Sequence, residues 1–168
     1  SIYIAEALSR PLSPEIEERA KIHLLDTLAA IISGSRLVPG ERAIAYVRTL
    51  GGTQEAGVMG TRIVTTAVNA ALANGMFGHA DETDDSHAPS LTHPGCAIVP
   101  AALAMAERQG RDGNALLRAV ALGYDIGTRT TLSLGPLAMD RKMHSSHTIG
   151  PMFGSAAAAG GLAGITPT

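Results

Sequence analysis

Apolar residues recur at helical spacing along most of the chain. Between positions 13 and 34 they return every three or four residues, the period of a helix face that packs on a core. Ser13 and Pro14 precede the run as a cap and a first helical residue, and acidic side chains follow in the first turn, where the helix dipole favours them. The pattern predicts an amphipathic helix that ends at Gly34.

Five further segments carry helix signals. The predicted helices cover residues 41–50, 66–77, 94–106, 112–134 and 148–162. The glycine-rich stretch from 51 to 60 predicts a loop or a short pair of strands, and no segment alternates apolar and polar residues as a half-buried strand does. We therefore predict an all-α domain of about six helices, without repeats or linkers.

The composition narrows the class of protein. Hydrophobic residues make up 45% of the chain and aromatic residues only 3%, while glycine occurs 19 times, so we expect closely apposed helices with Ala/Gly-rich packing. This apolar fraction excludes a disordered chain. Thirteen basic residues against fifteen acidic ones give a net charge of -2, which offers no basic surface for a nucleic acid.

Cysteine usage and the apolar runs indicate a location. Cys96 is the single cysteine, which excludes an internal disulfide and favours a reducing compartment. Residues 1–10 lack the pattern of a signal peptide, and the longest apolar run, 95–106, is too short for a membrane span. We expect a cytoplasmic protein with no membrane partner. Because the chain opens with Ser1 and stops in a turn-like Thr-Pro-Thr, we also expect a fragment.

Titratable residues concentrate between positions 79 and 93. The acidic members are Asp81, Glu82, Asp84 and Asp85, and the histidines are His79, His87 and His93. A solvated loop with Asp side chains in turns and caps is one interpretation. A second is a divalent metal site of His79, Asp84, Asp85 and His87, suited to Mn, Fe or Zn. A third is a metal-free acid/base set. The spacing does not decide between them.

A second polar constellation occupies residues 141–148, ahead of the last predicted helix. If Thr148 or Ser146 caps that helix, its first N–H groups would face whatever His144 touches, which is an anion site. The alternative is that His144 and His147 are ordinary residues of a cap region. The glycines from 154 to 161 do not form a dinucleotide fingerprint, because no strand precedes them.

Several of these motifs together resemble the MmgE/PrpD family. The matching segments are 74–87 (NGMFGHADETDDSH), 92–95 (THPG) and 100–107 (PAALAMAE), with further likeness at 20–28 and in the alanine-rich stretch 154–159. That family contains 2-methylcitrate dehydratases, cis-aconitate decarboxylases and iminodisuccinate epimerases.

The resemblance implies an enzyme without metal or other cofactor, built from a large helical domain and a smaller α+β lid domain, and usually a homodimer. Its members remove a proton beside a carboxylate and then lose water, lose CO2 or reprotonate. The lid, with its tyrosine, and the family's catalytic lysine lie downstream of this chain. Residues 1–168 are therefore expected to be the N-terminal portion of the helical domain, inactive alone.

Carried over by motif, the resemblance places catalytic roles on Glu82, His93 and His144. Glu82 stands where several members have Asp. Substrate-binding or supporting roles fall on a larger polar set, namely His79, Asp84, Asp85, Ser86, His87, Thr92, Ser146 and Thr148.

We expect a hydro-lyase similar to 2-methylcitrate dehydratase, acting on a small di- or tricarboxylate. One residue more than the decarboxylase pattern between Ser86 and His93 weakens a decarboxylase assignment. The alternatives are an epimerase or decarboxylase of the same family, a metal-dependent enzyme, and a non-catalytic helical module.

Overall fold

The computed structural model describes residues 2–141 and 145–166, most of which are helical. The elements in chain order are α1 (Ile2–Ala7), α2 (Pro14–Gly34), α3 (Val38–Thr49), β1 (Ala56–Gly57), β2 (Val64–Thr65), α4 (Ala67–Gly78), the 3₁₀ helix η1 (Ala88–Ser90), α5 (Gly95–Gln109), α6 (Gly113–Leu134), α7 (Pro136–Arg141) and α8 (Ser146–Leu162). The all-α prediction is confirmed. The expected number of about six helices is too low, because α1 and α7, with six residues each, are too short to show an apolar period.

Side-chain caps mark three helix starts where the sequence predicts them. Ser13 caps α2, with its Oγ accepting from the Ile16 N–H, and Thr66 and Asp112 cap α4 and α6 in the same way. The last helix differs from expectation. Ser145 caps α8, so the prediction that Thr148 or Ser146 would do so is wrong, and Ser146 is the first helical residue instead.

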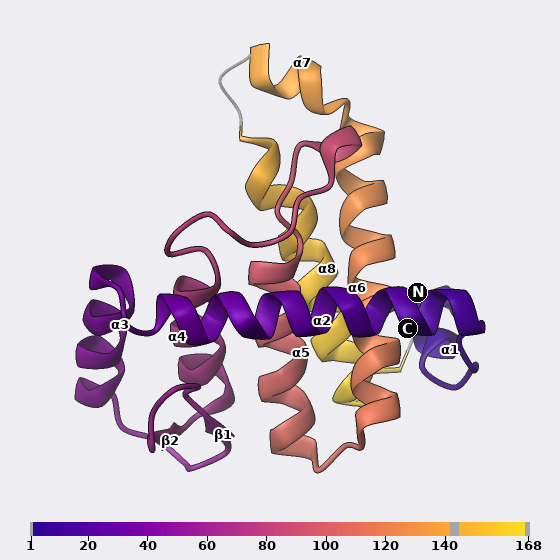
Figure 1. Ribbon diagram of the computed structural model, residues 1–168. Helices are drawn as coiled ribbons and strands as arrows, with labels where there is room; N and C mark the ends of the chain where they lie inside the picture. The colour runs from indigo at the N-terminus through magenta and orange to yellow at the C-terminus, as the bar shows by residue number, and fades with distance from the viewer. Residues whose placement is uncertain (1, 142–144, 167–168) are drawn as a thin grey trace.

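The helices pack in two groups that are joined by α2 and α5. Figure 1 shows α2 lying across α4, α5 and α6, and α2 contacts each of them. On one side α3 packs on α4, while on the other α6 packs along α8, and α5 contacts both α4 and α8. The two short strands pair antiparallel beside α4 and α5. Because α1 contacts α8, the two ends of the described chain lie close together (Figure 1).

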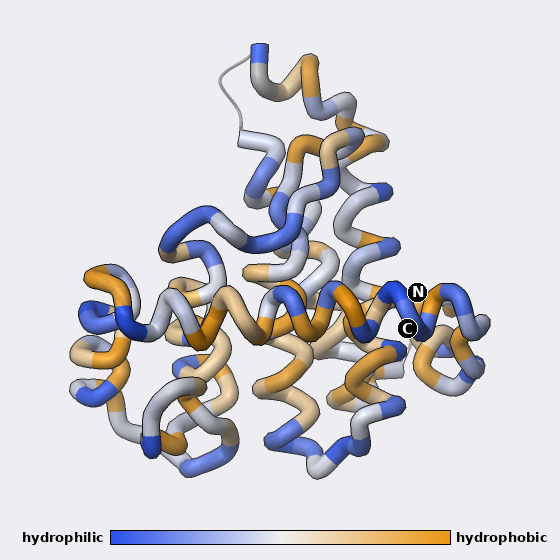
Figure 2. Tube along the Cα trace, viewed as in Figure 1, coloured by the Kyte–Doolittle hydropathy of each residue, from blue (hydrophilic) through white to orange (hydrophobic). Residues whose placement is uncertain are grey.

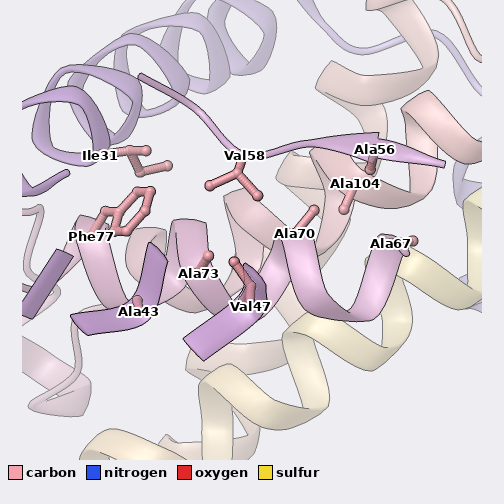
Figure 3. Packing of buried hydrophobic residues seen from close by; sticks show 10 residues of the cluster. All are labelled: Ile31, Ala43, Val47, Ala56, Val58, Ala67, Ala70, Ala73, Phe77 and Ala104. Atoms are coloured by element: carbon pink, nitrogen blue, oxygen red, sulfur yellow. The ribbon is translucent and has the colours of Figure 1, made fainter. Parts of the chain in front are cut away.

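The core is divided between these two groups. Figure 3 shows the first cluster, where Phe77 and Ile31 face Val47, Val58 and a set of alanines. The second cluster surrounds Ile98 between α5, α6 and α8. Helix α5 contributes Ala104 to the first cluster and Ile98 to the second, so it belongs to both.

Glycine allows a very close helix contact between α6 and α8. A Cβ at Gly150 would lie 1.9 Å from Thr131 Oγ1 and 2.3 Å from the Gly127 carbonyl oxygen. No side chain fits at such a distance, so the expectation of small-residue packing is met at this contact.

The loop between α4 and α5 carries the titratable segment. Figure 2 shows much of it as a hydrophilic stretch that follows the C-terminal end of α4. Within it, η1 and a bridge between His87 and Thr92 give local order, and Glu82 and Leu91 adopt left-handed backbone conformations. Among the described residues, no helix has both the length and the apolar character needed to cross a membrane.

Candidate active site

Asp84 is buried at the centre of a group of imidazoles. Its side chain is 0% exposed, and His79 Nδ1 donates to Asp84 Oδ1 at 2.9 Å, while His93 Nδ1 lies 3.7 Å from the same oxygen. Asp84 Oδ2 has no hydrogen-bond partner among the described residues. A carboxylate removed from water is costly unless donors compensate it, and the His79 N–H is the donor that Asp84 has here.

Asp85 is held on several sides. Its Oδ1 accepts from the Gly95 N–H at 2.9 Å, and its Oδ2 accepts from the Tyr124 hydroxyl at 2.6 Å and pairs with His23 Nδ1 at 2.9 Å. Pro94, the residue before α5, makes no side-chain cap, so Asp85 supplies the cap from ten residues upstream. A carboxylate at a helix N-terminus is favoured by the helix dipole.

His93 has one defined protonation pattern in its neutral form. Its Nδ1 lies 3.0 Å from the backbone carbonyl oxygen of Asp85. A carbonyl oxygen only accepts, so Nδ1 carries the hydrogen and Nε2 keeps its lone pair. The ring lies 5.2 Å from that of His79 and stacks on that of His147 at 5.4 Å, centroid to centroid. His93 is 27% exposed, so ligands can reach the cluster of His79, Asp84, His93 and His147, called here the imidazole cluster.

The structure brings His79, Asp84, Asp85 and His93 together. Other members of the predicted set have different surroundings. Glu82 and Ser86 are exposed on the outer part of the loop, and Glu82 has φ of 55°, a left-handed conformation that is strained for a residue with a side chain. Thr148 is exposed on the first turn of α8, and His144 lies outside the described residues.

Three residues of the predicted set, His87, Thr92 and Ser146, make hydrogen bonds that hold the loop in place. His87 Nδ1 and Thr92 Oγ1 both lie 2.7 Å from the buried Ser90 hydroxyl. Ser146 is buried and donates to the Leu91 carbonyl oxygen at 2.9 Å, which ties the loop to the start of α8. With their hydroxyls engaged inside the protein, Thr92 and Ser146 support the loop.

The set of metal ligands that the sequence offers as one interpretation is not assembled. Asp85 is occupied by Gly95, His23 and Tyr124, and His87 is bonded to Ser90. A different group, His79, Asp84 and Cys96, places one possible ligand atom each within 4.8 Å of one another. Burial, followed by the charge of Asp84, raises the pKa of the Cys96 thiol, so this sulfur is protonated and unreactive at neutral pH.

Sequence reasoning missed His23, Tyr124 and the stacking role of His147. His23 and Tyr124 come from α2 and α6, 62 and 39 positions from Asp85, and each occupies an ordinary place in its helix pattern. No local signal separates them from surface residues. His147 lies in the polar stretch ahead of the last predicted helix, but its contact with His93 depends on the packing of α8 against the loop.

Two hollows flank the site. A cavity of about 550 Å³ lies between α1, α2 and α6, and its lining includes His23, His87 and Tyr124 as well as four arginines, namely Arg10, Arg19, Arg118 and Arg129. On the other side, a shallow groove beside α4 is lined by His79 and Cys96. Two of these arginines are paired with carboxylates, Arg10 with Glu6 and Arg129 with Asp125.

The sequence matches the family model of the MmgE/PrpD N-terminal domain over residues 1–168. The chain therefore belongs to the MmgE/PrpD family. Among similar proteins, the cis-aconitate decarboxylase-like protein oryM of Aspergillus oryzae is 30% identical over 98% of this chain and 36% of its own length.

Two relatives named cis-aconitate decarboxylase agree with this match. The protein of Aspergillus terreus is 28% identical over 91% of this chain and 32% of its own length, and the human protein is 29% identical over 94% and 34%. The chain spans about a third of the length of these relatives.

Proposed function

We propose that this domain supplies the histidine and carboxylate half of an active site that moves a proton at a carbon beside a carboxylate. The substrate is a small di- or tricarboxylate, and the overall reaction is a dehydration similar to that of 2-methylcitrate dehydratase. The observation that carries the proposal is the partly exposed His93 ring beside the buried Asp84 carboxylate. Its Nδ1–H is fixed on a carbonyl, and no hydrogen bond from a described residue engages its Nε2 lone pair. A ring with an unprotonated nitrogen within reach of ligands is suited to act as a general base.

Charge is the main physical obstacle to this chemistry. Deprotonation beside a carboxylate adds negative charge to an anion, so the site must offer donors and positive potential. Within the proposal, His79 and His147 supply donors, while Asp84 and Asp85 are engaged inward and repel the substrate less than free carboxylates would.

The remaining roles rest on the family resemblance. Glu82 and His144 are proposed to transfer protons together with His93. The strained backbone of Glu82 supports a functional role, because such strain persists where the surroundings select it. Ser86, His87 and Thr148 are proposed to bind substrate or to position the loop, and Thr92 and Ser146 to hold the loop in shape. We further propose a cofactor-free homodimer in the cytoplasm.

Decarboxylation is the second candidate. It is favoured by the names of the relatives, which are cis-aconitate decarboxylases or proteins like them. One additional residue between Ser86 and His93 speaks against it in the comparison by motif. Both reactions need proton transfer at the same type of carbon, so the imidazole cluster fits either.

The test uses the full polypeptide that contains this domain. The protein is incubated in D2O with 2-methylcitrate or cis-aconitate, and NMR follows alkene formation, deuterium uptake and release of CO2. We expect turnover that falls at least about a hundredfold in His93→Gln, within the range for loss of a general base. The matched control is Gln109→Ala, an exposed change at the far end of α5, expected to keep full activity.

Two results would contradict the proposal. The first is full turnover by His93→Gln. The second is loss of activity on treatment with a chelator together with a stoichiometric metal that His79→Ala no longer binds, which would make the group of His79, Asp84 and Cys96 a metal site.

A further inference from the structure

Asp85 links the two helices α2 and α6 to the backbone that holds His93. Its side chain is 7% exposed, and its contacts come from His23 on α2, Tyr124 on α6 and the first N–H of α5. The carbonyl group of the same residue accepts from His93 Nδ1 at 3.0 Å. One residue therefore connects three helices by its side chain and the candidate base by its main chain.

The Asp85 carbonyl can hold His93 only while its peptide group keeps its orientation. The Asp85 side chain leaves the same residue, so anchoring both carboxylate oxygens restricts the backbone dihedrals that aim this carbonyl. Asp84 Oδ1 is a second oxygen near His93 Nδ1, but it lies 0.7 Å farther away, at 3.7 Å against 3.0 Å. At 3.7 Å the Asp84 oxygen is beyond hydrogen-bond range, so a turn of the peptide group leaves Nδ1 without an acceptor among the described residues. The contact that selects a hydrogen on Nδ1 over one on Nε2 is then lost.

We infer that His23 and Tyr124 are positioning residues that act through Asp85 to keep His93 in the tautomer with a hydrogen on Nδ1 and a free Nε2. Tyr124 donates the shortest of the three hydrogen bonds to the Asp85 side chain, and His23 donates to the same oxygen from the opposite helix. The value of this tautomer for catalysis rests on the proposed function, while the tautomer itself does not.

A direct contact with substrate is the competing explanation, since both residues line the cavity between α1, α2 and α6. Substrate contact and positioning predict different changes in KM, in kcat and in the His93 tautomer. A substrate contact changes KM and leaves the tautomer of the free protein alone. A positioning role changes the tautomer without substrate and lowers kcat with little change in KM.

The experiment uses the full polypeptide with ¹⁵N-labelled histidine and no substrate. Long-range ¹H–¹⁵N correlation reads the tautomer of each ring, and the His93 signals are assigned by their absence in His93→Gln. We expect a predominantly Nδ1–H ring in the wild type and a mixture of tautomers in Tyr124→Phe and in His23→Ala. His23→Asn should restore the wild-type spectrum, because its amide places an N–H close to the position of Nδ1.

Tyr3→Phe is the matched control. This change removes the 2.7 Å hydrogen bond from the Tyr3 hydroxyl to the carboxylate of Asp125, the neighbour of Tyr124 on α6. It leaves the contacts of Asp85 intact. We expect it to leave the His93 tautomer unchanged. In the turnover assay, Tyr124→Phe should lower kcat about tenfold at nearly constant KM, the scale expected for a misplaced catalytic group.

A wild-type tautomer of His93 in both Tyr124→Phe and His23→Ala overturns the inference, whatever the activity. If one variant fails to fold, the other decides alone. Absence of turnover in the wild type would overturn the proposed function and leave the tautomer result standing. The inference is also overturned if Tyr3→Phe changes the His93 tautomer as much as Tyr124→Phe does. The effect would then come from any disturbance of α6.

Discussion

Gly95 stands where the carboxylate of Asp85 meets the start of α5. A Cβ at this position would lie 2.4 Å from Thr27 Oγ1, 2.6 Å from Asp85 Oδ1 and 2.8 Å from the Tyr124 hydroxyl oxygen. Three polar groups surround the space that a methyl group would need. The absence of a side chain at Gly95 is therefore a condition for the Asp85 contacts.

Gly95→Ala should lower the free energy of unfolding by about 2–3 kcal/mol, because the added methyl group would push the Asp85 carboxylate and the Tyr124 hydroxyl out of their hydrogen-bonded positions. Urea denaturation measures the change. The matched control is Gly113→Ala, also the first residue of a helix, where a Cβ would meet nothing within 4 Å. This control should change stability by less than about 1 kcal/mol. Equal effects in both variants would contradict the prediction.

Tyr124 should make the protein sensitive to alkali. Burial, followed by the charge of Asp85 and the hydrogen bond to it, raises the pKa of Tyr124 above its ordinary value of 10.0. A raised pKa in the folded state means that the unfolded chain releases this proton first, so the stabilisation is complete below about pH 10 and is lost as the pH rises above it.

The wild type should therefore lose more stability than Tyr124→Phe between about pH 9 and 11, with a difference of up to about 1.4 kcal/mol per pH unit. Denaturation midpoints across this range measure it. Tyr46→Phe, at an exposed tyrosine of α3, is the control and should follow the wild type. A constant gap between wild type and Tyr124→Phe at all pH values would mean that the pKa of this phenol is the same in the folded and unfolded states, and would contradict the prediction.

At the residue scale, the sequence could predict which titratable residues lie near one another when they are close together in the chain. His79, Asp84, Asp85 and His93 share one short segment, so their density alone marked a site, and the structure brings them together. The contacts of Asp85 with α2 and α6 depend on how helices cross, and spacing along the chain contains no such information. The same reason explains why Glu82 could be chosen by motif although its side chain is exposed.

At the scale of elements, helix starts were more predictable than helix contacts. Ser13, Thr66 and Asp112 cap the helices that follow them, because capping depends on neighbours within three residues. At α8 three hydroxyl residues compete, Ser145, Ser146 and Thr148. Ser146 is taken into the helix because its hydroxyl bonds the Leu91 carbonyl, which a sequence pattern does not reveal.

The contact between α6 and α8 gives a prediction for a whole element. A Cβ at Gly154 would lie 2.4 Å from the Gly123 carbonyl oxygen and 2.9 Å from Ile98 Cδ1. Gly154→Ala should lower the free energy of unfolding by about 2–4 kcal/mol, since backbone cannot yield as a flexible side chain can.

The matched control on the same helix is Gly160→Ala, where the nearest contact is Ile165 Cδ1 at 3.5 Å. It should be neutral or stabilising, because alanine has the higher helix propensity. Thermal denaturation compares the two variants. If Gly160→Ala were the more harmful change, close packing between α6 and α8 would not limit stability.

On the scale of the whole molecule, α5 connects the two core clusters. Ala104 packs in the cluster of α3 and α4, and Ile98, fully buried, packs in the cluster of α6 and α8. A rigid helix shared by two clusters couples their opening. The described part of the chain should therefore unfold as one cooperative unit.

Ile98→Ala tests this coupling. We expect a loss of about 2–5 kcal/mol from the cavity it creates, with faster amide hydrogen exchange in α3 as well as in α6 and α8. Ile22→Ala, at a half-exposed position on α2, serves as the control with a small effect. Unchanged protection of α3 in Ile98→Ala would mean that the two clusters open separately.

The bond from the Ser146 hydroxyl to the Leu91 carbonyl has a consequence for chimeric proteins. It joins two stretches 55 positions apart, one before α5 and one at the start of α8. A recombinant that takes only one of these stretches from a relative risks leaving the buried Ser146 hydroxyl unsatisfied, at a cost of about 1–3 kcal/mol. Crossover points that keep both stretches from the same parent should yield the better-folded hybrids.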